Sequence, residues 1–334
     1  MDVRGALMAA EIAEQPVVLA RQLAADADGL AALRRRIADA KPRFVMLAAR
    51  GTSDHAALYA KYLVEVRWQI AAGLVSPSTL TLYDARPDLR DVLFLAVSQS
   101  GASPDLVRSV EIARACGALT VAVTNTPSSA LALAAEFHVD IHAGPELAVA
   151  ATKTYTAQLL ALYRLLVGGD ADALGEAAAR TLDLGEHAFA AATHWRDESH
   201  FVLTARGYSH ATAREGALKL METSYVPALA FSAADLVHGP MAMVGAGTPV
   251  IAVHTAGAGG ESMPPVLERL REVGADVLVV GDPNGLPLHT QGVDPVLLPI
   301  LEILPLQQLA WRLALDRGHD PDRPRGLSKV TQTW

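Results

Sequence analysis

The chain has 334 residues, of which 51% are hydrophobic and 19% charged, and its formal net charge is −8. This composition excludes a disordered chain, and the lack of any lysine–arginine cluster argues against a nucleic-acid partner. The single cysteine, Cys116, cannot form an internal disulfide, and the sequence shows neither a signal peptide nor a membrane span. We therefore expect a cytoplasmic protein without a membrane partner.

In chain order, a helix is expected to begin near Asp2, and short apolar runs then alternate with stretches of helical period. The runs are 44–48, 92–97, 119–123, 201–203, 249–253 and 277–280. They are mostly apolar throughout, which is typical of parallel strands covered by helices on both faces. A connecting helix is expected within 168–193. The segment after Asp316 is polar and proline-rich, which predicts an arm outside the core.

The second three runs repeat the first three. An Ala-Arg-Gly-x-Ser turn follows the first strand at 49–53 and again at 205–209. The next strand comes about 50 residues later in both halves, and the third about 25 after that. This repetition predicts an α/β chain of two duplicated domains, each a doubly wound, flavodoxin-like parallel sheet. The expected parts are an N-terminal helical segment (1–30), a first domain (31–170), a linker helix (171–195), a second domain (196–318) and a C-terminal arm (319–334).

A candidate anion site follows the run 92–97. Its residues are Ser98, Gln99, Ser100, Gly101, Ala102 and Ser103, and they lead into a helix. Hydroxyls and backbone N–H groups at a helix N-terminus can hold a phosphate without a lysine. Gly51, Thr52 and Ser53, after the first strand, would face the same crevice. The alternative is that Ser98 or Ser103 only caps the helix. The matching loop 254–260 has lost most of its hydroxyls, which favours binding by the first copy.

A second polar cluster runs from Glu146 to Thr156 and includes Ala150, Thr152 and Lys153. Small residues beside threonine and lysine suit a close approach of backbone to ligand. The same pattern is equally typical of a capped helix start.

Candidate acid–base groups occur in the second half. Glu215, Lys219 and Glu222 are spaced i, i+4 and i+7, which places them on one helical face. The alternative is an ordinary surface ion pair. Apolar neighbours at 218, 220 and 221, and the start of the helix at a strand end, instead favour partial burial and proton transfer.

Two further candidates stand outside helices. His238 lies in a His-Gly-Pro turn that could present its imidazole for proton transfer near neutral pH. Lys329 lies in the C-terminal segment, where apolar Leu327, Val330 and Trp334 suggest docking onto the protein. Burial there would favour the uncharged, nucleophilic amine.

These motifs together resemble the sugar isomerase (SIS) family over essentially the whole chain. The residues that carry the resemblance are Gly-Thr-Ser at 51–53, Ser-Gln-Ser-Gly at 98–101, Val-Ala-Ala-Thr-Lys at 149–153, Glu-Gly-Ala-Leu-Lys-Leu at 215–220, His-Gly-Pro at 238–240 and Lys329. Within the family, the chain resembles the isomerase half of glucosamine-6-phosphate synthase and the SIS-type glucosamine-6-phosphate deaminases.

The resemblance implies a role for each matching position. Glu222 would move a proton between C1 and C2 of the sugar, Lys219 would support it, and Lys329 would engage the open-chain sugar. His238 would open the ring from a neighbouring subunit, which implies a homodimer, and Glu215 completes the catalytic set. No metal or organic cofactor is implied. The sugar phosphate would be held by Gly51, Thr52, Ser53, Ser98, Gln99, Ser100, Ser103, Ala150 and Thr152.

The expected reaction is chosen from residues at the two ends of the chain and from two internal motifs. Residue 2 is Asp2, whereas the glutaminase domain of the synthase begins its mature chain with cysteine, so we expect no use of glutamine by that mechanism. Gly326 stands where synthases usually have asparagine, and Ser-Asp-His-Ala at 53–56 and Ser-Pro-Asp at 103–105 also resemble the deaminases. The expected reaction is water addition to an imine at C2, releasing ammonia and fructose 6-phosphate.

Other functions stay open at this stage. They are a stand-alone isomerase or ammonia-dependent synthase, a deglycase acting on an amine-linked sugar phosphate, and a sugar-phosphate sensor. Four positions depart from the family pattern and leave the exact sugar open: Ala102, Ala151, Leu229 and Asp235.

Overall fold

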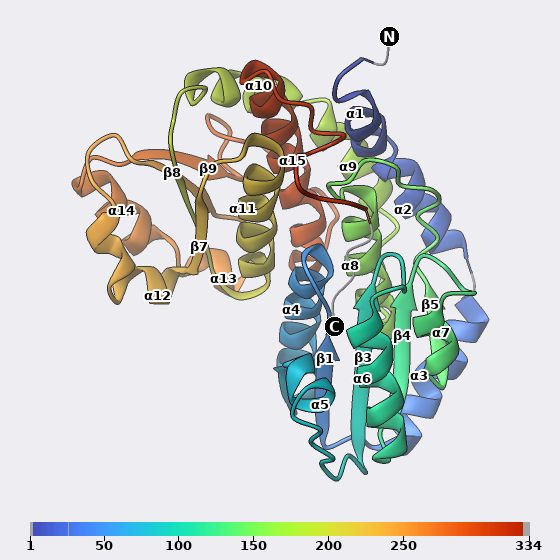
Figure 1. Cartoon of the computed structure of the whole chain (residues 1–334). Coiled ribbons are helices and arrows are strands. Elements are labelled where there is room, and N and C mark those ends of the chain that lie inside the picture. Colours follow the sequence, from blue (N-terminus) through green and yellow to red (C-terminus); the bar gives the residue numbers. More distant parts are fainter. Residues whose placement is uncertain (1–2, 26, 330–334) are drawn as a thin grey trace. The chain divides into compact units, whose positions relative to one another are not determined.

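The computed structural model describes residues 3–25 and 27–329. Contacts divide the chain into two compact units, each built on one parallel sheet (Figure 1). The first-sheet unit holds Val18–Glu146, Lys153–Asp170 and the chain from Ser328 onward. The second-sheet unit holds the chain up to Val17, Leu147–Thr152 and Ala171–Leu327. Each unit therefore combines segments that are far apart in the sequence.

The first sheet has the strand order β2-β1-β3-β4-β5, and every neighbouring pair is parallel. The order is that of a flavodoxin-like doubly wound sheet, which confirms the predicted fold class. Its strands are β1 (Phe44–Ala48), β2 (Ala71–Leu74), β3 (Val92–Ser98), β4 (Leu119–Thr124) and β5 (Phe137–Asp140).

Helices cover both faces of this sheet, because its central strand is apolar on both sides. Phe94 and Ala96 of β3 pack with Leu106 and Val110 in one buried cluster. The alternate β3 residues are also buried, and α4 and α8 contact the sheet and each other. The helices are α2 (Gln15–Ala24), α3 (Ala27–Ala40), α4 (Thr52–Leu63) with a π-helical turn (Val64–Trp68), α5 (Pro77–Thr81), α6 (Pro104–Ala115), α7 (Ala130–Ala134) and α8 (Lys153–Leu166).

The second sheet has the order β7-β6-β8-β9, which matches the first four positions of the first sheet. Its strands are β6 (Phe201–Ala205), β7 (Ala228–Ser232), β8 (Pro249–Val253) and β9 (Asp276–Val280). Its helices are α1 (Ala6–Ala13), α9 (Leu174–Leu182), α10 (Gly185–His194), α11 (His210–Ser224), α12 (Ala233–Val237), α13 (Ala258–Glu261), α14 (Pro264–Glu272) and α15 (Leu298–Asp316), with 3-10 turns at Gly207–Ser209, Pro240–Met243 and Pro295–Leu297.

The shared turn after β1 and β6 supports the duplication at the backbone level. Gly51 has φ 55° and Gly207 has φ 65°, a left-handed region that favours glycine. Both turns lie between the first strand of a sheet and the helix that follows it. The equivalences β1 with β6 and β3 with β8 follow from this turn and from the sheet order.

One helix among the described residues, Pro295–Asp316, is long and apolar enough to cross a membrane by length and composition alone. Its apolar window is 89% buried inside the fold. The apolar side chains of α15 therefore have a role in the core of the second-sheet unit.

The structure differs from two expectations at the two ends of the second-sheet unit. The first helix begins at Ala6 rather than near Asp2, and Gly5 at its N-cap provides no side-chain cap. Asp322 supplies the missing acceptor, taking hydrogen bonds from Met8 N at 2.8 Å and Leu7 N at 3.0 Å. Pro321, Asp322 and Pro324 are buried, so the prediction of an arm outside the core is wrong for these residues.

Two smaller differences remain. The stretch expected to hold one connecting helix contains two, α9 and α10, because a short break at Asp183–Leu184 separates them. Val330 and Trp334, expected to dock the C-terminal segment, lie outside the described residues.

Candidate functional site

The turn after β3 carries hydroxyls that are already oriented by backbone N–H groups. Ser98 Oγ accepts from Gly101 N at 3.1 Å, and Ser100 Oγ accepts from Ala102 N at 3.3 Å. Because a hydroxyl can accept and donate at once, each oxygen can still donate its proton to an anion. Gly101 has φ 63°, and a Cβ there would lie 2.2 Å from Ser129 Oγ, so only glycine fits this turn.

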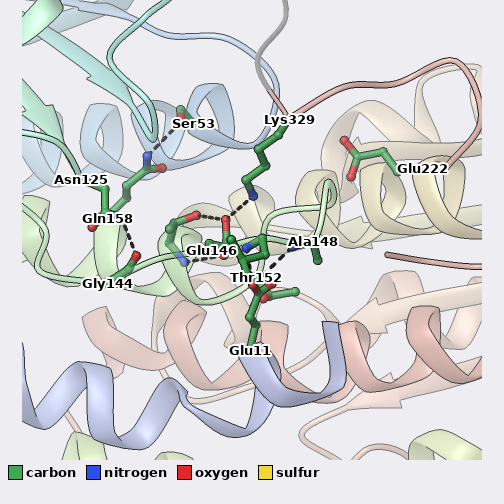
Figure 2. Close-up of polar contacts among 12 residues, drawn as sticks. Glu11, Ser53, Asn125, Gly144, Glu146, Ala148, Thr152, Gln158, Glu222 and Lys329 are labelled. Carbon is green, nitrogen blue, oxygen red and sulfur yellow. Dashed lines mark hydrogen bonds and ion pairs between the residues drawn. The ribbon is translucent and has the colours of Figure 1, made fainter. Parts of the chain in front are cut away.

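The turn after β1 has a similar arrangement. Ser53 is buried, and its Oγ accepts from Gln158 Nε2 at 2.9 Å (Figure 2). Ser53 is thus oriented by an amide of α8, and its own proton can still be donated. Thr52 opens α4 beside Gly51, so the N-termini of α4 and α6 both lie at the carboxyl edge of the sheet, where helix dipoles favour an anion.

An ion pair ties the two turns together. The Arg50 guanidinium bonds Asp105 Oδ2 through Nη2 at 2.7 Å and through Nε at 2.9 Å. Asp105 lies in the first turn of α6 and is nearly fully buried. The pair fixes the loop after β1 against the start of α6, so the hydroxyls of both turns stand at the same edge of the sheet.

The capping alternative does not describe these serines. Ser103 stands at the N-cap of α6 but makes no side-chain cap hydrogen bond, and Ser98 bonds within its own turn. Gln99 and Ser103 are both partly exposed. The structure places the predicted phosphate residues of the first half at the carboxyl ends of β1 and β3, and their role in binding stays a prediction: Gly51, Thr52, Ser53, Ser98, Gln99, Ser100 and Ser103.

Lys329 reaches the same unit and is held there by an acid. Its Nζ lies 2.8 Å from Glu146 Oε2, and the Glu146 side chain is fully buried (Figure 2). Glu146 also accepts from Thr154 N at 3.0 Å and Thr154 Oγ1 at 2.7 Å, at the N-terminus of α8. In this structure Lys329 is ion-paired and its side chain is 24% exposed, and its use as a nucleophile stays a prediction.

Two hydrogen bonds from Asn125, the residue after β4, position the loop before Glu146. Asn125 Nδ2 donates to Gly144 O at 2.7 Å, and Asn125 Oδ1 accepts from Ala143 N at 2.9 Å (Figure 2). One backbone carbonyl and one backbone N–H of this loop are thus hydrogen-bonded, just before Glu146, the acid that holds Lys329.

The second-sheet unit carries a buried charge array on α11. Lys219 Nζ lies 3.1 Å from Glu215 Oε1 and 2.6 Å from Glu222 Oε2. Lys219 and Glu215 are fully buried, whereas 20% of the Glu222 side chain is exposed. Burial alone would lower the pKa of Lys219, but the charges of Glu215 and Glu222 and hydrogen bonds to both raise it overall. The surface ion-pair alternative is therefore wrong, and Glu222 is the member of the array that reaches solvent.

Close packing holds α11 in place. A Cβ at Gly216 would lie 2.8 Å from Leu306 Cδ1 and 3.1 Å from Leu203 Cδ2, so the helix backbone lies close against β6 and α15. Thr223 Oγ1 bonds Lys219 O at 2.8 Å and Ala310 O at 3.2 Å. These contacts fix the position of α11, the helix that carries the array.

The remaining predicted residues of this unit lie apart from the array. His238 is exposed at the C-cap of α12, and no hydrogen bond joins its imidazole to the α11 acids within the described part of the unit. Ala150 and Thr152 are buried in a loop whose backbone N–H groups at 147 and 148 donate to Glu11. Gln307 Nε2 donates to Thr152 O at 3.3 Å.

A cavity of about 690 Å³ in the first-sheet unit does not involve the predicted residues. Its lining includes Arg34, Arg35, Ile37, Trp68 and Ile70. Ile37 precedes β1 and Ile70 precedes β2, so the cavity lies at the amino ends of the strands. Ligands of doubly wound sheets bind at the opposite edge, where the serine turns are.

Sequence reasoning missed several residues that orient this chemistry, namely Glu11, Arg50, Asn125, Glu146 and Gln158. Glu146 carried a signal, since it opens the polar cluster before α8. Gln158 and Asn125 are single polar residues in otherwise ordinary elements, and only the fold shows what they contact.

Comparison with known proteins decides the family. The family model described as "SIS domain" matches residues 37–168 and 195–294, which is more than half of the chain. The chain belongs to the SIS domain family. This confirms the resemblance carried by the motifs.

The most similar curated relatives include two archaeal proteins named glutamine–fructose-6-phosphate aminotransferase (isomerizing). That of Pyrococcus horikoshii is 35% identical over 85% of this chain and 51% of its own length. That of Thermococcus kodakarensis is 33% identical over 96% of this chain and 57% of its own length. The chain thus spans about half the length of the curated relatives it matches.

Solved structures match over nearly their full length. A protein of Silicibacter pomeroyi DSS-3, provisionally assigned as a phosphosugar isomerase, is 32% identical with a TM-score of 0.84 and covers 96% of this chain and 100% of its own. The C-terminal domain of glucosamine-fructose-6-phosphate aminotransferase from Francisella tularensis is 26% identical, with a TM-score of 0.83 and coverage of 95% and 98%. A glucosamine-6-phosphate deaminase of Thermotoga maritima shares the fold at 22% identity, with a TM-score of 0.81 and coverage of 98% and 100%.

Proposed function

We propose that the chain is a phosphosugar enzyme that converts glucosamine 6-phosphate and water to fructose 6-phosphate and ammonia. The observation that carries this proposal is the buried Glu215–Lys219–Glu222 array, in which one carboxylate reaches solvent while an internal lysine donates to it. A binding protein needs no such array, whereas proton transfer between adjacent carbons needs a fixed carboxylate. The SIS family and the names of the relatives support a phosphosugar substrate.

The proposed reaction begins with binding and ring opening. The phosphate lies against Ser53, Ser98 and Ser100, whose hydroxyl protons are available to its oxygens. His238 takes the proton of the C1 hydroxyl and returns a proton to the ring oxygen, which gives the open-chain aldehyde.

The next step moves a proton. Glu222 removes the proton from C2 and delivers it to C1, while the carbonyl oxygen at C1 becomes a hydroxyl and the amine at C2 becomes an imine. Water then adds to C2 of the imine and gives a carbinolamine. The hydroxyl proton of this carbinolamine moves to the nitrogen, which leaves as ammonia. The products are fructose 6-phosphate and ammonia, and no electrons enter or leave the system.

Lys329 has the role of engaging the open-chain sugar. Its ammonium is held by Glu146 at a fixed place in the first-sheet unit, which also holds the serine turns. The lysine proton can pass to the nitrogen at C2, which departs as ammonia. In the covalent version of this step, Lys329 gives up that proton and its amine adds to C2 of the imine, ammonia leaves, and water then hydrolyses the Lys329 imine to free fructose 6-phosphate and the lysine amine.

The proposal includes a homodimer and no cofactor. His238 would act in the site of the partner copy, which agrees with its exposed position and its separation from the α11 array. Among the described residues, no group of three His, Cys, Asp or Glu side chains is placed to hold a metal ion. The steps above use only the chain's own groups.

A second candidate function is the isomerase step of an aminotransferase-type synthase. The curated relatives carry the aminotransferase name, and this favours the synthesis direction, with fructose 6-phosphate as substrate. The same Glu222 and Lys329 would serve both directions, because each proton-transfer step is reversible.

The test is to incubate the purified protein with glucosamine 6-phosphate and follow ammonia and fructose 6-phosphate together. The proposal predicts the two products in equal amounts. Synthesis from fructose 6-phosphate and ammonium without net deamination would favour the second candidate. Isomerisation of a neutral sugar phosphate without ammonia, or tight binding without turnover, would contradict the proposal and favour a plain isomerase or a sensor.

A further inference from the structure

A buried carboxyl group on α15 takes no part in the proposed reaction. Glu302 is fully buried and accepts three hydroxyl hydrogen bonds. Ser209 Oγ donates to Oε1 at 2.8 Å, Thr255 Oγ1 donates to Oε1 at 2.6 Å, and Thr212 Oγ1 donates to Oε2 at 2.8 Å. A fully buried acid on an apolar core helix is costly unless hydrogen bonds compensate its loss of solvent.

Two of the three hydroxyls stand at positions that have a counterpart in the first sheet. Ser209 belongs to the Arg-Gly turn after β6, and its counterpart after β1 is Ser53. Thr255 follows β8, whose counterpart is β3, the strand that leads into the serine turn. Thr212 lies in the first turn of α11, where the helix dipole favours negative charge. The donors therefore surround the carboxyl edge between the two central strands of the second sheet.

The turn after β1 and the turn after β6 differ in how closely other parts of the chain pack against them. A Cβ placed on Gly51 would meet no atom within 4 Å among the described residues. A Cβ on Gly207 would lie 3.5 Å from Gly259 Cα, and a Cβ on Gly259 would lie 2.4 Å from Arg206 O. The turn after β6 thus lies in contact with α13, the helix that follows β8, whereas the position of a Cβ on Gly51 is open.

We infer that the Glu302 carboxyl group fills the ligand crevice of the second sheet. The second sheet has lost most hydroxyls of the loop 254–260, and the three hydroxyls that surround this position, here called the cradle, bind the carboxyl group of Glu302 instead of an external anion. Each chain then has one crevice for a sugar phosphate rather than two. The same carboxyl group ties α15 to the first turn of α11 and so helps to hold the helix that carries Glu222. The inference rests on the cradle alone and is independent of the reaction proposed above.

The test is chemical rescue of a cavity. Glu302→Ala empties the cradle and leaves room for a small carboxylate, whereas Glu302→Leu removes the carboxyl group but fills the space. We expect both substitutions to lower the melting temperature by about 5 °C or more, since each leaves hydroxyls without their acceptor. Sodium formate should restore much of the lost stability of Glu302→Ala and little of that of Glu302→Leu, relative to sodium chloride at equal ionic strength.

Two outcomes would overturn the inference. One is an Ala variant as stable as the parent chain, and the other is an equal formate effect on both variants and the parent chain. If Glu302→Ala does not fold, Glu302→Ser leaves a smaller cavity for the same formate measurement. As a second readout, calorimetric titration of the parent chain with inorganic phosphate should give at most one site per chain, and two sites would contradict the inference.

Discussion

Lys329 Nζ lies 2.8 Å from Glu146 Oε2, so this lysine is held by an acid that also binds the first turn of α8. Glu146 is bonded at both oxygens to Thr154, which leaves the carboxylate little freedom. A lysine on a C-terminal segment would otherwise be among the least ordered groups of the chain. The ion pair gives it a defined place before any sugar binds.

Glu146→Gln should therefore slow the reaction without unfolding the protein. The amide keeps the size of the side chain but loses one charge-assisted hydrogen bond, and we expect kcat for ammonia release to fall about tenfold with a small change in KM. Glu111→Gln, which removes a surface carboxylate from the same unit, is the matched control. A kcat equal to that of the control would show that Glu146 does not position Lys329.

Glu222→Gln should separate binding from chemistry. Losing the carboxylate proposed to move the proton should lower kcat by about a thousandfold, within the usual contribution of a general base. Calorimetry should show that glucosamine 6-phosphate still binds, because the proposed phosphate site lies in the first-sheet unit and not on α11. Glu261→Gln, an exposed acid of the second-sheet unit, serves as control. Equal loss of binding and turnover would favour a sensor.

Removing hydroxyls from the phosphate crevice should weaken binding of the substrate. Ser53→Ala and Ser98→Ala each remove one hydrogen bond to a charged group, and we expect KM for glucosamine 6-phosphate to rise about tenfold. The measurement is KM in steady-state assays, with Ser76→Ala, an exposed serine of the same unit, as control. An unchanged KM in both variants would place the phosphate elsewhere.

Glu302 predicts a specific dependence of stability on pH. Burial raises the pKa of Glu302 above its ordinary value of 4.5, and hydrogen bonds from Thr255, Ser209 and Thr212 oppose that rise. A raised pKa means that the protonated form is favoured in the folded chain, so the contribution to stability is full below pH 4.5 and is lost as pH rises through the folded value. The parent chain should therefore lose stability relative to Glu302→Gln over that window. A difference in melting temperature that does not vary between pH 4 and 8 would contradict this.

A composite site predicts complementation between inactive variants. If His238 acts in the partner's site, a mixed dimer of Glu222→Gln and His238→Ala contains one intact site. Refolding the two variants together in equal amounts should then restore about a quarter of the parent activity, since half of the dimers are mixed. Activity no greater than the mean of the separate variants would show that both residues act within one chain.

The sequence predicts the fold well because the signals are local. The runs 44–48 and 249–253 coincide with β1 and β8, since each is an uninterrupted apolar segment between polar turns. The strands β2, β5 and β7 were not predicted from the sequence. β2 and β5 have only four residues each, and Leu229 and Ala230 of β7 are not fully buried.

The candidate site was predictable where it depends on short motifs. Serines 98 and 100 and the α11 array follow from turn chemistry and helical spacing, and the structure places each set together within its unit. The partner of Lys329 and the role of Glu302 depend on contacts between distant segments. Glu302 is about 90 residues from Ser209 and Thr212 in the chain, and no local pattern signals that proximity.

The most direct test of the account is a crystal structure of Glu222→Gln with glucosamine 6-phosphate. The account predicts the phosphate on Ser53, Ser98 and Ser100, with C1 and C2 within about 3–4 Å of the residue 222 side chain and the sugar within reach of Lys329. A phosphate bound away from the serine turns, or a sugar carbon skeleton distant from both residue 222 and Lys329 in every subunit, would contradict it.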